Sequence, residues 1–154
     1  MDVFSALAIT PDDLFAGETL IRSVGTNVLL PLYPNTGNVD AKPYVIGSSA
    51  PQKVLGMLHL TNYRLKFKPA ELSGAAFSIF LPAIAKAENA SWFFVRKFRI
   101  TMTDATSIEF VMWGIRPFLA IVNKTRLQAE TLNWDAITAE VAAAERKVGD
   151  WQVA

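Results

Sequence analysis

The chain has 154 residues, 51% hydrophobic and 19% charged, which fits one globular domain with a sizeable core and excludes a disordered chain. It contains no cysteine, which excludes disulfides and thiolate chemistry, and we expect a cytoplasmic protein. The net charge is only +1, yet residues 56–128 carry ten basic and four acidic residues, so the middle of the chain would attract anions.

The N-terminal segment is expected to form an arm on the domain. Acidic residues rather than Lys or Arg flank its short apolar stretch, so residues 1–16 do not have the pattern of a secretory signal. Thr10 and Pro11 predict a short helix, with Thr10 as its N-cap. The longest nearly apolar run, residues 75–85, is far shorter than the roughly 20 residues that span a bilayer. We therefore expect a soluble protein, or one that touches a membrane peripherally.

The next segments predict a first strand and a long loop. Residues 17–32 are rich in Val, Leu, Ile and Thr, and Gly25 indicates a bulge or turn within one long strand or between two short ones. Residues 33–53 are rich in Pro, Gly and Ser and predict an unusually long loop. This loop either packs Tyr33 and Tyr44 on the domain surface, the interpretation we favour, or binds a ligand over the end of the sheet.

The clearest pattern lies in residues 56–69. Two runs of alternating polar and apolar residues meet at Thr61-Asn62, which predicts a β-hairpin with one apolar face. The opposite face carries three cations in a row, Arg64, Lys66 and Lys68. His59, the single histidine, is expected on the solvent side of its strand.

Four further strands are expected over residues 76–81, 84–89, 92–103 and 107–113. Short connections make an antiparallel meander of about seven strands the natural arrangement. In the third of these strands, Phe94, Phe98, Ile100 and Met102 share an apolar face. Arg96 falls on the same face, which indicates either a bulge or a strand that starts outside the core.

The pattern changes to a helical period after Gly114. Pro117 suits a first helical turn, and the apolar residues that follow it are spaced three and four apart, which predicts one amphipathic helix. Asn133 is a candidate N-cap for a second helix that ends before Gly149. The chain is thus mainly β with helices at its C-terminal end.

The hairpin Gly56-Met57-Leu58-His59-Leu60-Thr61-Asn62-Tyr63-Arg64-Leu65-Lys66-Phe67 resembles the G-x-L-x-L-T-N-x-R-L-x-F hairpin of GRAM domains, including those of myotubularin-type proteins. Residues 80–86 look like the strand that follows it there, although the Leu-Pro pair is shifted by one hydrophobic position. The resemblance covers about residues 17–128. It implies a pleckstrin-homology-like (PH-like) barrel of seven antiparallel strands capped by a helix. It also implies a peripheral role in binding phosphoinositides, other membrane components or protein partners.

On this basis we expect three parts: an arm at residues 1–16, a GRAM domain at 17–130 that includes the long loop, and an additional helix at 131–154. The additional helix and the long loop depart from the family pattern.

No catalytic, metal or cofactor site is expected. His59 has no neighbouring cluster of metal ligands and no Ser or Cys at a spacing typical of nucleophilic catalysis. The glycines form neither a phosphate-binding loop nor a dinucleotide-binding pattern. We therefore expect a binding module and not an enzyme.

Two groups of residues are candidates for binding. If their strands curve toward a common rim, five cations are candidate contacts for an anionic lipid headgroup; otherwise they keep the strand faces soluble. These cations are Arg64, Lys66, Lys68, Lys97 and Arg99. The candidates for an interaction surface are Tyr33, Tyr44, Trp92 and Phe93, and the aromatic run could serve as core and interface or as a membrane-inserting edge.

Two functions stay open at this point. The first is recruitment to an anionic membrane surface through a phosphoinositide-type headgroup or another lipid. The second is binding to a protein partner, or self-assembly into a homo-oligomer, without any lipid ligand. Nucleic acid is not an expected partner, because no RNA-binding motif is present and the net charge is near zero.

Overall fold

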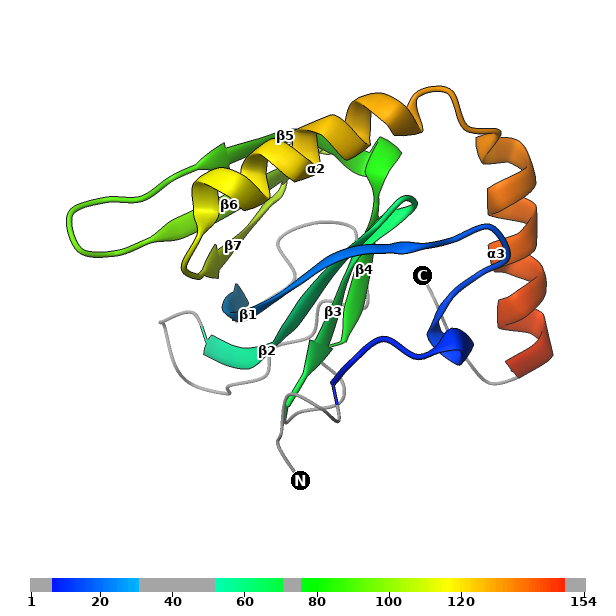
Figure 1. Cartoon of the computed structure of the whole chain (residues 1–154), viewed down its shortest axis with the longest axis horizontal. Helices are drawn as coiled ribbons and strands as arrows, with labels where there is room; N and C mark the ends of the chain where they lie inside the picture. Colours follow the sequence, from blue (N-terminus) through cyan, green and yellow to red (C-terminus); the bar gives the residue numbers. More distant parts are fainter. Residues whose placement is uncertain (1–6, 31–51, 71–75, 149–154) are drawn as a thin grey trace.

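A computed structural model describes residues 7–30, 52–70 and 76–148 of the chain (Figure 1). Seven strands form one antiparallel sheet in the order β4-β3-β2-β1-β7-β6-β5. Their bounds are β1 Leu20–Leu30, β2 Gln52–Thr61, β3 Arg64–Pro69, β4 Phe77–Phe80, β5 Ile84–Asn89, β6 Lys97–Met102 and β7 Ser107–Val111. Two short 3-10 helices, η1 (Pro11–Asp13) and η3 (Leu81–Ala83), and two α-helices, α2 (Ile115–Ala129) and α3 (Trp134–Val148), complete the described elements. The predicted mainly β, seven-stranded antiparallel fold with C-terminal helices is confirmed.

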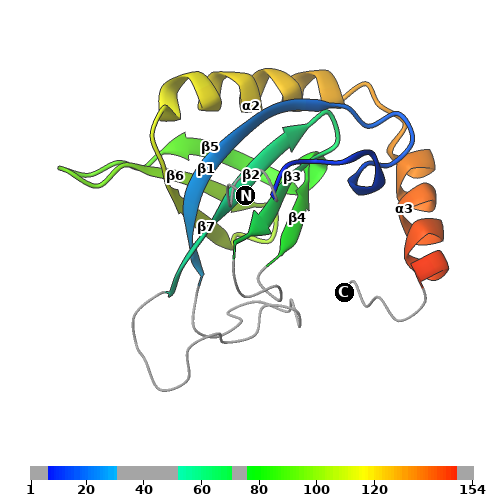
Figure 2. The same cartoon turned by 60° about the horizontal axis from the view of Figure 1, so that its bottom comes forward.

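The sheet bends around a core that its alternating residues build. Leu58 and Leu60 of β2 and Leu65 and Phe67 of β3 are fully buried, as the period-two pattern predicts. From the other half of the sheet, residues such as Phe98 of β6 enter the same core. Helix α2 lies along β5 and covers one open side of the curved sheet (Figure 2). Its buried stripe includes Phe118 and Val122, and Phe118 meets Phe98 edge to face.

The residues before β1 form an arm that lies across the outer face of β2 and β3 (Figure 2). The predicted short helix is present as η1, and the Asp13 carboxylate accepts hydrogen bonds from the backbone N–H and hydroxyl of Thr10. Helix α3 begins as predicted, because the Asn133 side chain accepts a hydrogen bond from the N–H of Ala136. It packs on the domain through Trp134, whose ring lies edge-on to Tyr63.

Two local predictions are wrong. Gly25 marks no break, because it pairs with Met57 inside the continuous strand β1, and the irregularity in the pairing lies instead between Leu20 and Arg22. The strand predicted over residues 92–103 starts only at Lys97. Residues 92–96 run beyond the last pairing of β5 and β6, and no other described strand pairs with residues 92–95.

Candidate functional site

The polar residues of the β2–β3 hairpin turn hold the start of β1. Asn62 accepts a hydrogen bond from the N–H of Thr19 and donates one to the carbonyl of Gly17, at 2.7 and 3.0 Å. The hydroxyl of Thr61 donates to the carboxylate of Glu18 at 2.6 Å. Gly17 has a φ of 78°, a left-handed conformation that glycine adopts without strain. The Thr-Asn part of the motif is therefore a clamp for residues 17–19.

Arg64 belongs to the same clamp. Its guanidinium donates to both carboxylate oxygens of Glu18, with Nε 2.9 Å from Oε2, and both side chains are almost fully buried. The rings of Phe15 and Phe80 lie 4.7 and 5.7 Å from the guanidinium carbon. This predicted headgroup contact is thus enclosed, with its charge balanced by Glu18.

Lys68 and Lys66 lie on the same outer face of β3, under the arm. Lys68 forms an ion pair with Asp13 at 3.0 Å and donates to the carbonyl of Ala8. Lys66 has no ion pair or hydrogen bond with any described residue. Burial, followed by the positive charge of Arg64, lowers the pKa of the Lys66 ammonium group.

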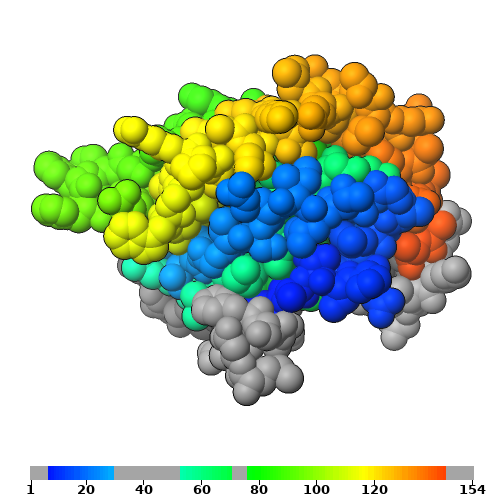
Figure 3. Space-filling view, in the orientation of Figure 1, coloured from blue at the N-terminus to red at the C-terminus, as the bar shows by residue number. Residues whose placement is uncertain are grey.

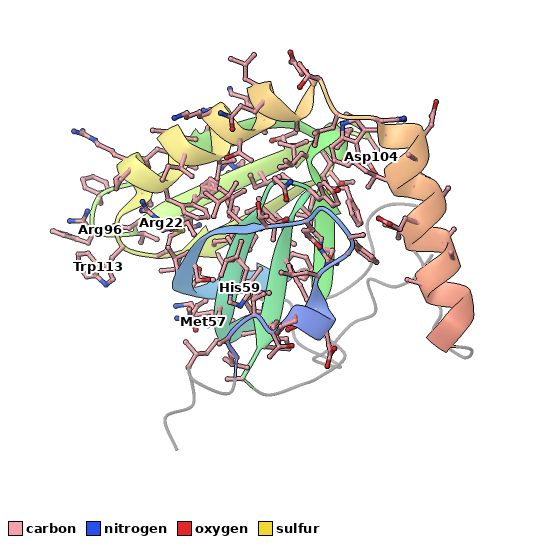
Figure 4. All side chains as sticks on the ribbon, turned by 45° about the vertical axis from the view of Figure 1, so that its right-hand side comes forward. Arg22, Met57, His59, Arg96, Asp104 and Trp113 are labelled. Atoms are coloured by element: carbon pink, nitrogen blue, oxygen red, sulfur yellow. The ribbon has the colours of Figure 1, made fainter. Side chains whose placement is uncertain are left out.

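His59 was expected to face solvent, and this prediction is wrong. Its exposed fraction is 0%, because the arm covers the outer face of β2 at this point (Figure 4). Its Nε2 lies 2.8 Å from the carbonyl oxygen of Leu7, and its Nδ1 lies 2.7 Å from the hydroxyl of Ser23. A carbonyl only accepts, so Nε2 carries the hydrogen and, in the neutral ring, Nδ1 accepts from Ser23. Desolvation lowers the pKa of His59, which favours this neutral form.

Lys97 and Arg99 lie on the outer face of β6, separated from β3 by β7, β1 and β2 in the order of the sheet. Arg99 forms ion pairs with Glu109 of β7 at 2.8 Å and Glu88 of β5 at 3.2 Å. Lys97 lies 3.5 Å from the carboxylate of Glu109. The structure therefore does not bring the five predicted cations to a common rim, and four of them are paired with acids.

A group of exposed apolar side chains lies at the turn between β5 and β6. Trp92 and Val95 exchange two backbone hydrogen bonds of 2.9 and 2.8 Å, which makes Phe93 and Phe94 the two residues of a tight turn. The exposed fractions of Trp92, Phe93 and Phe94 are 69%, 82% and 98%. This turn, residues 92–95, projects from the body of the domain (Figure 3) and is called the aromatic tip below.

A stacked pair accompanies the aromatic tip. The guanidinium carbon of Arg96 lies 4.5 Å from the ring centre of Trp113, which is itself 78% exposed, and both residues lie at the same end of the molecule (Figure 4). No acidic side chain of the described residues pairs with Arg96. Arg116, which is exposed, follows Trp113 by three residues in the first turn of α2. The guanidinium of Arg96 thus adjoins an exposed aromatic ring.

Sequence analysis identified Trp92 and Phe93 and missed Phe94, Arg96 and Trp113 as surface residues. The sequence did carry a signal for Arg96, since a cation on a predicted core face indicated either a bulge or a strand that starts outside the core. The second alternative is correct, because β6 begins at Lys97. The other interaction candidates, Tyr33 and Tyr44, lie outside the described residues.

In residues 7–30, 52–70 and 76–148, no group of three or more histidine, aspartate or glutamate side chains could hold a metal ion. No helix within those ranges is long and apolar enough to cross a membrane.

Comparison of the sequence with protein-family models and with curated proteins gives no match. Solved structures do match. The C-terminal domain of an unknown protein from Leishmania infantum is 19% identical, with a TM-score of 0.53 over 73% of this chain and 87% of that one. The N-terminal PH domain of Vps36 is 14% identical, with a TM-score of 0.51 over 77% of this chain and 86% of that one. Together with the seven-stranded antiparallel sheet and its C-terminal helices, this similarity shows that the chain has a PH-like fold.

Proposed function

We propose that this chain is a non-catalytic, GRAM-type binding module that docks on anionic membrane surfaces by inserting its aromatic tip. The observation that carries the proposal is the exposure of three consecutive aromatic side chains at a projecting turn. An exposed apolar group of this size is unusual in a protein that stays fully in water. Its GRAM character is supported by the motif at residues 56–67.

The shape and composition of the tip favour a membrane over a protein groove as its partner. The tip is convex and narrow, with Phe93 and Phe94 at its apex and Trp92 beside them. Phenylalanine gains about 2 kcal/mol when its side chain leaves water, and tryptophan prefers the boundary between headgroups and acyl chains. Two inserted phenylalanines would therefore contribute several kcal/mol.

Arg96, which directly follows the tip, and the exposed Arg116 in the first turn of α2 supply the electrostatic part of the interaction. Arg96 and Arg116 are exposed, and no described acidic side chain neutralises Arg96. A basic residue close to an anionic membrane contributes about 1 kcal/mol, and salt screens this attraction. Stacking on Trp113 holds the Arg96 guanidinium at one place next to the tip.

Co-sedimentation with lipid vesicles tests this proposal. We expect the protein to bind vesicles that contain phosphatidylserine more strongly than vesicles of phosphatidylcholine alone, and less strongly as salt is raised. The double variant Phe93→Ser, Phe94→Ser should lose at least about tenfold in affinity, because it removes the inserted apolar surface. Arg96→Glu should weaken binding to the anionic vesicles and reduce the salt dependence.

The matched control is Leu127→Ser. Leu127 is 67% exposed near the C-terminal end of α2 and lines a groove together with Leu81 and Trp134. This end of α2 lies away from the β5–β6 turn (Figure 1). Vesicle binding that is unchanged in the tip variant, or reduced equally in the control, would contradict tip insertion. The alternative function, protein interaction or self-assembly without lipid, predicts no vesicle binding. It also predicts a dimer or partner complex that the tip or control variant disrupts.

A further inference from the structure

A row of polar side chains crosses four strands on the outer face of the sheet. Ser23 of β1 is directly opposite His59 of β2, His59 is opposite Lys66 of β3, and Lys66 is opposite Ser78 of β4. Directly opposed residues place their side chains on the same face of a sheet. These four residues, called the donor row below, therefore form one continuous polar line.

The donor row offers hydrogen-bond donors, so a ligand that binds it would have to supply acceptor atoms. Ser23 donates to Nδ1 of His59, which leaves the Nε2–H of His59 as the outward donor. Ser78 accepts a hydrogen bond from Arg64 at 3.1 Å, so its own hydroxyl hydrogen stays available. Lys66 adds an ammonium group. An imidazole, an ammonium and a hydroxyl thus offer hydrogens from one line.

The arm meets this surface with oxygen atoms. The Leu7 carbonyl accepts from His59, and the Ala8 carbonyl and the Asp13 carboxylate accept from Lys68. The carbonyl of Asp13 accepts from Arg64. Residues 7–13 therefore present three carbonyls and one carboxylate to cationic or N–H donors, as an oxyanion would.

Lys66 is the member of the row that the arm leaves unsatisfied. None of the described residues accepts a hydrogen bond from its ammonium group or forms an ion pair with it. Arg64 and Lys68 lie two positions away on the same face, and each is paired with an acid, Glu18 and Asp13, so Lys66 is the unpaired cation of the three. Burial is the main cause of the lowered pKa of Lys66, and the charge of Arg64 lowers it further, while the charge of Asp13 acts in the opposite direction.

We propose that the donor row, together with Lys68, is a binding face for a phosphate-bearing ligand, and that residues 7–13 occupy it in this structure as an internal competitor. The clamp on residues 17–19 stays closed, while residues 7–13 are attached by fewer contacts and leave when the ligand binds. This face lies on β1–β4 under the arm, apart from the aromatic tip (Figure 4), so the inference does not depend on membrane insertion.

Titration of the full-length protein with inorganic pyrophosphate, followed by isothermal calorimetry, tests the proposal. Asp13→Asn removes the charge of the competitor but keeps a side-chain oxygen for Thr10, and we expect binding to tighten about two- to fivefold. Adding Lys66→Met to that variant should abolish binding. Because Lys66 lacks an acidic partner, Lys66→Met should not lower the melting temperature, so loss of binding cannot be attributed to unfolding.

The control replaces an exposed lysine elsewhere, Lys124→Met on α2. A second titration uses phosphatidylcholine vesicles that carry a phosphatidylinositol phosphate. Lys66-dependent binding of pyrophosphate assigns the site to soluble phosphates, and Lys66-dependent binding of the vesicles alone assigns it to a headgroup; either result supports the face. Equal losses in Lys66→Met and Lys124→Met, no gain from Asp13→Asn, or no binding in either titration would overturn it.

Discussion

At the scale of single residues, Arg64 shows how an apparent surface charge becomes part of the structure. Alternation along β3 correctly places it on the outer face, opposite the core residues Leu65 and Phe67. The sequence could not reveal that Glu18, 46 residues earlier, returns to this face and pairs with it. The pairing depends on a tertiary contact of the arm, which no local period encodes.

Breaking this pair should destabilise the protein strongly. In Glu18→Gln the buried guanidinium of Arg64 loses its counterion, and we expect the free energy of unfolding to fall by about 3–5 kcal/mol in urea denaturation. The double variant Glu18→Gln, Arg64→Met should recover part of that loss. Equal stability of the wild type and Glu18→Gln would contradict a buried ion pair.

His59 predicts a pH dependence of stability. Its folded pKa lies below the usual value of 6.5, so the unfolded chain binds more protons between the two values. The free energy of unfolding should therefore fall as the pH drops below about 6.5. Protonated His59 would face Lys66 and Lys68 beneath the arm, and Asp13 is the acid of the described residues whose charge acts on it.

The variant His59→Gln isolates this effect. Its amide can still donate to the Leu7 carbonyl but does not titrate. The free energy of unfolding should therefore depend less on pH below about pH 6.5 in this variant than in the wild type. Hydrogen exchange of residues 7–13 should rise in the wild type over the same range and not in the variant. An identical pH profile for both proteins would exclude His59 as the titrating group.

At the scale of elements, the β5–β6 hairpin shows what a period-two pattern cannot predict. Period-two alternation of large residues predicts a strand through Trp92, yet strand pairing ends at Asn89 and Phe98. Alternation reports which residues share a face, but it does not report whether a second layer covers that face. Here no described element covers it, and residues expected in the core form the aromatic tip.

The turn at the tip is strained, which allows stability and binding to be separated. Phe93 has a φ of 50°, a left-handed conformation that costs a non-glycine residue about 1 kcal/mol. Phe93→Gly should therefore leave the melting temperature unchanged or slightly raised while it weakens vesicle binding. A large loss of stability in this variant would show that Phe93 supports the fold.

Gly56 on β2 is a position where, in contrast to Phe93, a glycine is required by its neighbours. A methyl group there would overlap the carbonyl oxygen of Lys68 and lie 2.7 Å from the ring of Phe67. Gly56→Ala should lower the free energy of unfolding by about 1–3 kcal/mol, measured by urea denaturation. A neutral effect would mean that β2 and β3 can separate at this position.

At the scale of the whole molecule, the sequence was sufficient to predict the architecture but not to predict which charges are paired. Short connections and a final amphipathic helix predict the seven-stranded, helix-capped sheet, because these rules are local. Of the ten basic residues in the middle of the chain, in contrast, five form ion pairs with acidic side chains: Arg64, Lys68, Lys86, Lys97 and Arg99. Glu88 and Glu109 pair with cations of β5 and β6, and Asp13 and Glu18 come from the arm to pair with those of β3. Lys66 and Arg96, which pair with no acidic side chain of the described residues, lie on the two faces proposed for binding.

The most direct test of tip insertion uses the absence of native cysteine. A single cysteine in Phe94→Cys, labelled with the environment-sensitive dye NBD, reports the polarity at the apex of the tip, and Leu127→Cys is the matched control. On phosphatidylserine vesicles, we predict a blue-shifted and stronger emission at position 94 and no change at position 127. Vesicle binding without a change at position 94, or with equal changes at both positions, would contradict docking by the aromatic tip.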